Sequence, residues 1–239
     1  MRYKRKHLIF LFFLSFAIPE IVAQNEEKVN ILIVPFDRFS FLSQFPLEEL
    51  AAINQVEKDS VYVLFKEKVV RELSIPYQKY HFFELREKER RDLLQRLPQV
   101  YKTKPTTHMG FEVDKVVKSG YLKRLLKNFS ADYILLFNHY ELKKKMLLSP
   151  QNFEGSKFIP WSSHNFAYEV FDPEGNLIAL DENLTIKPNL PNQTNYMNQG
   201  LMVESLSGRL IALQLDILLK IEKYKGKAVY RLKNRDYKK

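Results

Sequence analysis

The chain has 239 residues, a formal net charge of +10 and no cysteine. Without cysteine the sequence excludes a disulfide framework, a thiol nucleophile, cysteine-ligated metal and the acylated cysteine of a lipoprotein. Much of the basic charge lies in Tyr224–Lys239, with seven basic residues and one acidic residue, so the charge does not predict a basic nucleic-acid-binding face on the body of the chain.

The N-terminus has the features of a secretory signal peptide in the usual order. Basic residues within 2–6 precede the apolar run Leu8–Ile18, and Ala23 offers a small residue for cleavage. A transmembrane helix needs roughly 20 apolar residues, so this run is too short to be a membrane anchor. The sequence therefore predicts a signal peptide over residues 1–23 and no transmembrane span after its removal.

The first element of the body is a buried strand within "VNILIVPFD", Val29 to Asp37. Apolar residues at nearly every position predict a strand covered on both faces, as in a parallel or mixed sheet flanked by helices. The elements expected next are two helices within 45–74, a strand over 80–85, a charged helix over 86–97, a loop over 98–110 and a helix over 111–129. They are followed by a strand over 131–142, a loop over 144–161, a hairpin over 163–186, a loop over 187–196 and a helix over 197–222.

Two glycines add detail to this order. Gly120 interrupts the helical pattern over 111–129, which indicates a kink or two helices in series. Gly175 lies in "DPEGN" between two alternating apolar runs, where its tolerance of positive φ favours a β-hairpin turn.

The pattern predicts an α/β (α+β) fold. We expect a single two- or three-layer domain over residues 24–223, with a basic tail over 224–239. Helices pack on a mixed sheet of about five strands, and the element order is β-α-β-α-α-β-β-β-α.

Three phrases carry a resemblance: "ILIVPFD" at the first strand, "ADYIL" at Ala131–Leu135 and "VFDPEGN" at Val170–Asn176. With this element order they resemble the small α/β domain of the TolB amino-terminal-domain and curli-pore families and of the outer-membrane activators of penicillin-binding proteins. The chain also resembles uncharacterised exported proteins of Bacteroidetes type. The resemblance implies an envelope protein that works through contacts with other proteins, and it implies no catalytic residues.

The first strand does not lead into a phosphate-binding loop. No glycine-rich phosphate motif occurs, and the bulky residues Phe36, Arg38, Phe39 and Phe41 follow the strand. Asp37 lies where α/β folds often bind ligands, although an Asx-turn or a helix cap also explains an aspartate there. With Trp161 as a further anchor, the candidate partner- or ligand-binding residues are Asp37, Arg38, Phe39, Phe41 and Trp161.

The aromatic run Phe36–Phe45 has two interpretations: an exposed contact surface, or a buried plug at the end of the sheet. His139 and His164 fall on strands expected to be neighbours, where they are either a pair for metal or acid–base chemistry or ordinary strand histidines. No zinc-binding spacing occurs, and we expect no metal, no cofactor and no catalytic residues.

The function expected from these observations is an exported, non-enzymatic accessory protein of the cell envelope. It would be periplasmic or outer-membrane-associated, would not be a lipoprotein and would bind an envelope protein partner rather than nucleic acid. Its basic tail would contact anionic surfaces. The alternatives are a small-molecule or glycan binding module with a cleft at Asp37, Arg38 and Trp161, and a hydrolase that uses Asp37 with a histidine.

Overall fold

The structure, a computed structural model, describes residues 28–102, 108–148, 158–187 and 196–224. Its first strand, β1 (Val29–Val34), contributes to two apolar cores. Ile31 and Ile33 belong to one core, whereas Leu32 and Val34 belong to the other. Because successive side chains of a strand point to opposite faces, β1 is covered on both faces, as its uninterrupted apolar run predicts.

The main sheet has six strands in the order β3-β1-β6-β7-β8, with β2 also pairing with β6. The strands after β1 are β2 (Phe41–Ser43), β3 (Tyr80–Glu84), β6 (Tyr133–Leu148), β7 (Phe158–Phe171) and β8 (Leu177–Ile186). β1 runs parallel to β3 and β6, and β2 is parallel to β6, whereas the β6/β7 and β7/β8 pairs are antiparallel. The expected α/β class with a mixed sheet is therefore confirmed.

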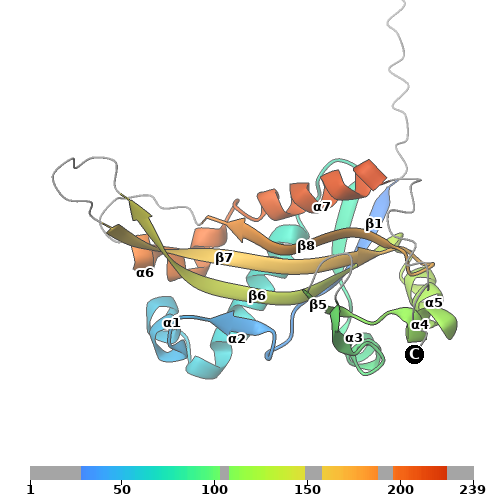
Figure 1. The fold of residues 1–239 in the computed structure, drawn as a ribbon, viewed down its shortest axis with the longest axis horizontal. Coiled ribbons are helices and arrows are strands. Elements are labelled where there is room, and N and C mark those ends of the chain that lie inside the picture. Colours follow the sequence, from blue (N-terminus) through green and yellow to red (C-terminus); the bar gives the residue numbers. More distant parts are fainter. Residues whose placement is uncertain (1–27, 103–107, 149–157, 188–195, 225–239) are drawn as a thin grey trace, which may run out of the picture.

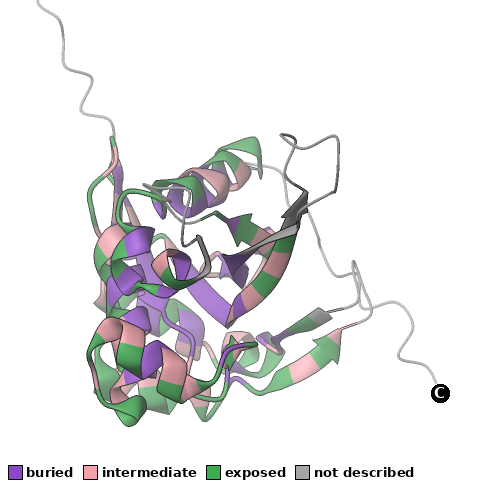
Figure 2. Cartoon of the chain, turned by 90° about the vertical axis from the view of Figure 1, so that its left-hand side faces the viewer, coloured by how far each residue is buried: buried purple, intermediate pink, exposed green. Residues whose placement is uncertain are grey.

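Helices cover both faces of the sheet, and Figure 2 shows the buried strands enclosed between helices that are exposed on their outer sides. The first core receives side chains from α1 (Leu47–Asn54), α2 (Val61–Leu73), α6 (Tyr196–Leu201) and α7 (Ile211–Tyr224). The second receives them from α3 (Glu87–Leu94), α4 (Asp114–Lys118) and α5 (Tyr121–Asn128). In Figure 1, α3, α4 and α5 gather at one end of the long strands, and α1 and α6 lie at the other.

Gly120 divides the helical region over 111–129, as its position in the sequence indicates. It separates α4 from α5 and has φ +67°. A side chain rarely adopts this left-handed conformation, so glycine allows the chain to end one helix and begin the next at once.

Part of the expected loop over 98–110 is instead a separate two-stranded hairpin, formed by β4 (Gln99–Lys102) and β5 (His108–Phe111). Glu169 of β7, which is fully buried, fastens it to the main sheet. Its carboxylate accepts hydrogen bonds from Lys102 Nζ and from the backbone N–H of Phe111, each at 2.7 Å. Because the contact comes from a distant strand, the local sequence does not reveal it.

The expected loop over 144–161 is also partly strand, because β6 continues to Leu148 and β7 begins at Phe158. The three lysines over 143–145 give this segment a polar pattern that does not indicate a buried strand. They nevertheless pair in register with β7, because strand pairing uses backbone hydrogen bonds, which do not depend on the side chains. Residues 149–157 lie outside the described ranges.

The single helix expected over 197–222 is divided in two. α6 is followed by a 3-10 turn over Val203–Leu206, and α7 begins only at Ile211. Gly208, with φ +66°, lies in the break, and its N–H donates to Glu72 Oε2 at 3.1 Å.

The segments on which the export and tail predictions rest, residues 1–23 and 225–239, lie outside the described ranges. Among the helices that the structure does describe, none combines the length and the apolar character needed to cross a membrane.

Candidate functional site

The connection from β1 to β2 is held in a defined conformation. Asp37 Oδ1 accepts a hydrogen bond from the backbone N–H of Ser40 at 2.8 Å, which is an Asx-type turn. The backbone carbonyl of Ser40 in turn accepts a hydrogen bond from the N–H of Tyr140 in β6 at 3.0 Å. The hydroxyl of Tyr62 donates to the carbonyl of Phe36 at 3.1 Å. Asp37 therefore shapes this connection.

The phenylalanines of this region divide between the core and the surface. Phe36 and Phe45 are buried, and Phe41 is partly buried against the ring of Phe65 at a centroid distance of 5.7 Å. Phe39, by contrast, is 91% exposed. Both interpretations of the aromatic run are thus partly correct: most of it closes the end of the sheet, and one ring is presented to solvent.

A shallow groove of about 280 Å³ is lined by residues that flank Phe39 in the chain, among them Arg38 and Phe41. Its polar rim includes the ion pairs Arg38–Asp59 at 3.3 Å and Lys58–Glu48 at 2.5 Å, all four with exposed side chains. Such exposed pairs contribute little to stability and can rearrange when a partner binds. The groove is lined by Arg38, Phe41, Leu42, Ser43, Phe45, Leu47, Lys58, Asp59 and Tyr62.

Within the described residues, β2 pairs on one side only, with β6. The carbonyl of Ser40 faces β6. Because backbone groups of successive residues in a strand point to alternate sides, those of Phe41 and Ser43 face away from β6. This short strand therefore offers a free edge that borders the groove, and we call the groove, the β2 edge and Phe39 together the Phe39 surface.

Trp161 does not join this surface. It lies on β7 opposite Lys145, further along β6 than Tyr140, which pairs with Phe41. Its indole is buried, and Lys187 Nζ lies 5.8 Å from the ring centroid. The predicted cleft between Asp37, Arg38 and Trp161 is consequently not formed, because β6 and β7 carry the tryptophan away from the end of β1.

His164 lies in the core rather than in a reactive site. Its ring is fully buried and stacks on Tyr140, with Nδ1 at 2.6 Å from the Tyr140 hydroxyl and Nε2 at 2.9 Å from the carbonyl of Gly200. The carbonyl only accepts, so Nε2 carries the proton and Nδ1 accepts from the tyrosine. Burial lowers the pKa of His164 to about 4.

His139 and His164 do not form a pair, which was one of the two interpretations of their positions. His139 aligns with Ala167 and adjoins Tyr140 in β6, so it faces the side of the sheet opposite to His164. Burial also lowers the pKa of His139. None of the hydrogen bonds among the described residues joins either histidine to Asp37, which argues against the proposed hydrolase pair. The described residues contain no cluster of His, Asp or Glu side chains suited to a metal ion.

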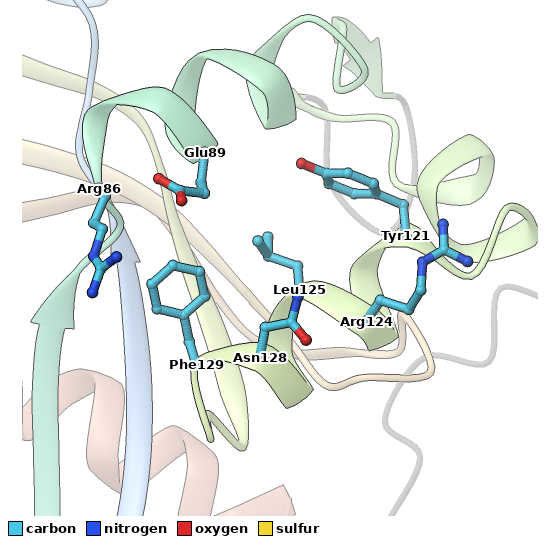
Figure 3. Close-up of a pocket in the computed structure, with 7 residues that line it drawn as sticks. All are labelled: Arg86, Glu89, Tyr121, Arg124, Leu125, Asn128 and Phe129. Atoms are coloured by element: carbon cyan, nitrogen blue, oxygen red, sulfur yellow. The ribbon is translucent and has the colours of Figure 1, made fainter.

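A larger cavity, of about 400 Å³, lies between α3 and α5 and was not predicted (Figure 3). The sequence predicts only a charged helix over 86–97. The spacing of Tyr121, Arg124 and Asn128 places these polar side chains on one face of α5, and the sequence could have indicated this face. Only the folded structure places α3 opposite it. The cavity is lined by Arg86, Glu89, Tyr121, Arg124, Leu125, Asn128 and Phe129.

No protein-family model and no curated protein matches this chain. Among solved structures, the hypothetical protein CT253 from Chlamydia trachomatis aligns over 82% of this chain and 97% of its own, with 13% identity and a TM-score of 0.35. A neuraminyllactose-binding hemagglutinin homolog from Helicobacter pylori aligns over 83% of this chain and 87% of its own, with 9% identity and a TM-score of 0.34. These similarities are too low to support a functional argument.

Proposed function

We propose that this chain is an exported, non-enzymatic accessory protein of the cell envelope that binds another protein through the Phe39 surface. The observation that carries the proposal is the 91% exposure of Phe39 on a connection whose neighbouring residues are fixed by hydrogen bonds. A large aromatic ring held at the surface loses little conformational freedom on binding, and such rings are frequent anchors of protein interfaces. The export part of the proposal rests on the N-terminal sequence pattern.

The partner is expected to add an extended segment to the edge of β2. The outward backbone groups of Phe41 and Ser43 can pair with such a segment, and the adjoining groove can receive its apolar side chains. In this mode of recognition the backbone hydrogen bonds supply affinity and the side-chain pocket supplies specificity. Phe39 then packs against the bound segment from the connection that precedes β2.

The test places a photo-crosslinking amino acid at position 39 and applies light to cells that produce the protein. A specific adduct is expected from position 39 and not from Leu219, an equally apolar position on α7 that is 69% exposed. With the partner purified, Phe39→Ser should weaken binding by roughly 30-fold, the effect of losing about 2 kcal/mol at an interface anchor. Equal adducts from both positions, or unchanged affinity, would refute the proposed surface.

A second variant tests strand addition itself. Ser43→Pro removes an N–H that faces away from β6, so it should weaken partner binding while leaving the β2–β6 pairing in place. Ser43→Ala is the matched control, because both changes remove the hydroxyl that accepts from the N–H of Phe45. If proline and alanine have the same effect on affinity, the partner does not pair with β2.

A further inference from the structure

The outer face of α7 carries an apolar stripe that is open to solvent in the part of the chain that the structure describes. Leu219 is 69% exposed and Ile211 47% exposed, and Leu215 between them is half-buried. These residues recur at every fourth position, which places them along one side of the helix. We call Ile211, Leu215 and Leu219 the α7 stripe. The opposite side of the helix is buried in the first core through Leu213, Ile217, Leu218 and Ile221.

A helix that is apolar on opposite sides is normally enclosed on both of them. Only one side of α7 rests on this fold, and Figure 1 shows the helix on the rim of the molecule beside β8. The helix is held firmly there, since Gln214 Nε2 donates to the carbonyls of Leu73 at 3.2 Å and Ile75 at 2.9 Å. Ile75 is itself 54% exposed, so it adds an apolar residue beside the helix. The α7 stripe is therefore suited to contact an apolar environment outside the chain.

The acidic side chains of α7 are paired with cations of the protein itself. Lys220 Nζ lies 2.7 Å from Asp216 Oδ2 on the same helix and 2.6 Å from Asp181 Oδ2 on β8. Glu222 pairs with Lys79 at 3.5 Å. Each carboxylate of the helix thus has a cationic partner, which weakens the repulsion that it would exert on an anionic surface.

The sequence that follows α7 is strongly basic. Lys223 lies in the last turn of the helix, and residues 225–239 contain seven lysine or arginine residues and one aspartate. An apolar helix face next to a cluster of basic residues is the combination by which proteins bind the surface of an anionic membrane. The apolar side chains enter the boundary between headgroups and acyl chains, and the basic side chains are attracted to the negative headgroups.

We propose that the α7 stripe docks on an anionic lipid surface, with Leu219 and Ile211 in the boundary between headgroups and acyl chains. Charge selects this occupant, because a lipid surface matches both the stripe and the basic residues after it, whereas a second copy would bring another basic tail. The tail supplies attraction that salt screens, and the stripe supplies apolar contact that salt does not screen. The Phe39 surface is separate, since α7 contacts β8, whereas β2 pairs with β6 on the other side of β7.

Tryptophan fluorescence tests the contact at a single position. The only tryptophan of the chain, Trp161, is buried, so Leu219→Trp adds a reporter on the stripe, and Phe39→Trp is the control at another exposed position. With vesicles that contain phosphatidylglycerol, the emission of Leu219→Trp should shift to shorter wavelength and be quenched by bromine atoms on the acyl chains. Phe39→Trp should show neither change beyond that of the native chain. Absence of quenching in Leu219→Trp, or equal quenching at both positions, would overturn the proposal.

Co-sedimentation with the same vesicles measures how much the stripe contributes. Leu219→Ser should weaken binding by about fivefold or more, because the side chain loses its favourable transfer out of water. This ratio should persist in added salt, unlike the contribution of the tail. Val63→Ser, at a 39% exposed position on α2, is the control and should leave binding unchanged. Unchanged binding of Leu219→Ser would overturn the proposal, as would a dimer in solution that this variant dissociates, because a second copy would then cover the stripe.

Discussion

At the scale of single residues, His164 shows how strongly burial in the core determines the protonation state of a side chain. It is a fully buried imidazole whose partners are the hydroxyl of Tyr140 and the carbonyl of Gly200. Burial disfavours its charged form and lowers its pKa to about 4, whereas burial raises the pKa of Tyr140. Both groups therefore stay neutral and hydrogen-bonded near neutral pH, and they join α6 to the sheet.

This residue should make the folded state sensitive to mild acid. The pKa of His164 is lower in the folded chain, about 4, than the 6.5 of an unperturbed histidine. The unfolded state therefore binds the proton first, so stability is complete above about pH 6.5 and is lost as the pH falls toward 4. Linkage predicts a loss of about 2 kcal/mol in the free energy of unfolding between pH 7 and pH 5.

Urea unfolding at a series of pH values measures this loss. His164→Gln should remove most of the dependence in that window, and His139→Gln should remove less because its ring is not fully buried. Parallel pH profiles of the native chain and His164→Gln would contradict the assignment.

At the scale of elements, the β7–β8 turn shows local and tertiary constraints acting on one residue. Asp172 accepts hydrogen bonds from the N–H groups of Glu174 at 3.0 Å and Asn176 at 2.8 Å. Between them Gly175 has φ +79°, and a β-carbon there would lie 2.2 Å from Val117 Cγ2. The turn thus packs against α4, and Gly175 is required both by its conformation and by the space available.

Gly175→Ala should lower the free energy of unfolding by roughly 2–4 kcal/mol, the sum of left-handed strain and overpacking. Gly208→Ala is the matched control. Gly208 has a similar φ of +66° but no atom within 4 Å of the added carbon, so only about 1–2 kcal/mol of strain applies. Denaturant unfolding of both variants separates the cost of backbone strain from the cost of the contact with Val117. Equal losses of unfolding free energy in the two variants would show that the contact with Val117 is relieved at little cost.

At the scale of the whole molecule, charge is distributed unevenly. The tail Tyr224–Lys239 has a net charge of +6 out of +10 for the chain, and residues 24–223, between the predicted signal peptide and the tail, carry only +1. Such a segment is attracted to anionic membranes, by about 1 kcal/mol for each basic residue near the surface, in a salt-dependent manner. The predicted contact of the tail with an anionic surface therefore remains independent of the Phe39 surface.

Deletion of residues 225–239 should reduce binding to vesicles that contain anionic lipid by more than about tenfold at low salt. Binding to neutral vesicles should not change, and added salt should remove the difference between the two chains. Co-sedimentation with vesicles measures both effects. Unchanged binding to anionic vesicles after deletion would leave the tail without this role.

Several features follow from short stretches of the sequence, because their cause is local. The apolar run of β1 predicts burial on both faces, Gly120 predicts the division between α4 and α5, and "DPEGN" predicts the turn after β7. The mixed α/β class follows from the order of such patterns. Each depends on backbone preference or on periodicity within a few residues.

Other features were decided only by the tertiary structure, because their cause lies in distant parts of the chain. The β4–β5 hairpin depends on Glu169, and packing against distant elements buries Phe36 and Phe45 while Phe39 stays exposed. The cavity lined by residues of both α3 and α5 exists only once these two helices pack together. The sequence by itself therefore determined the fold class and several turns, whereas packing between distant segments decided which side chains meet and which reach solvent.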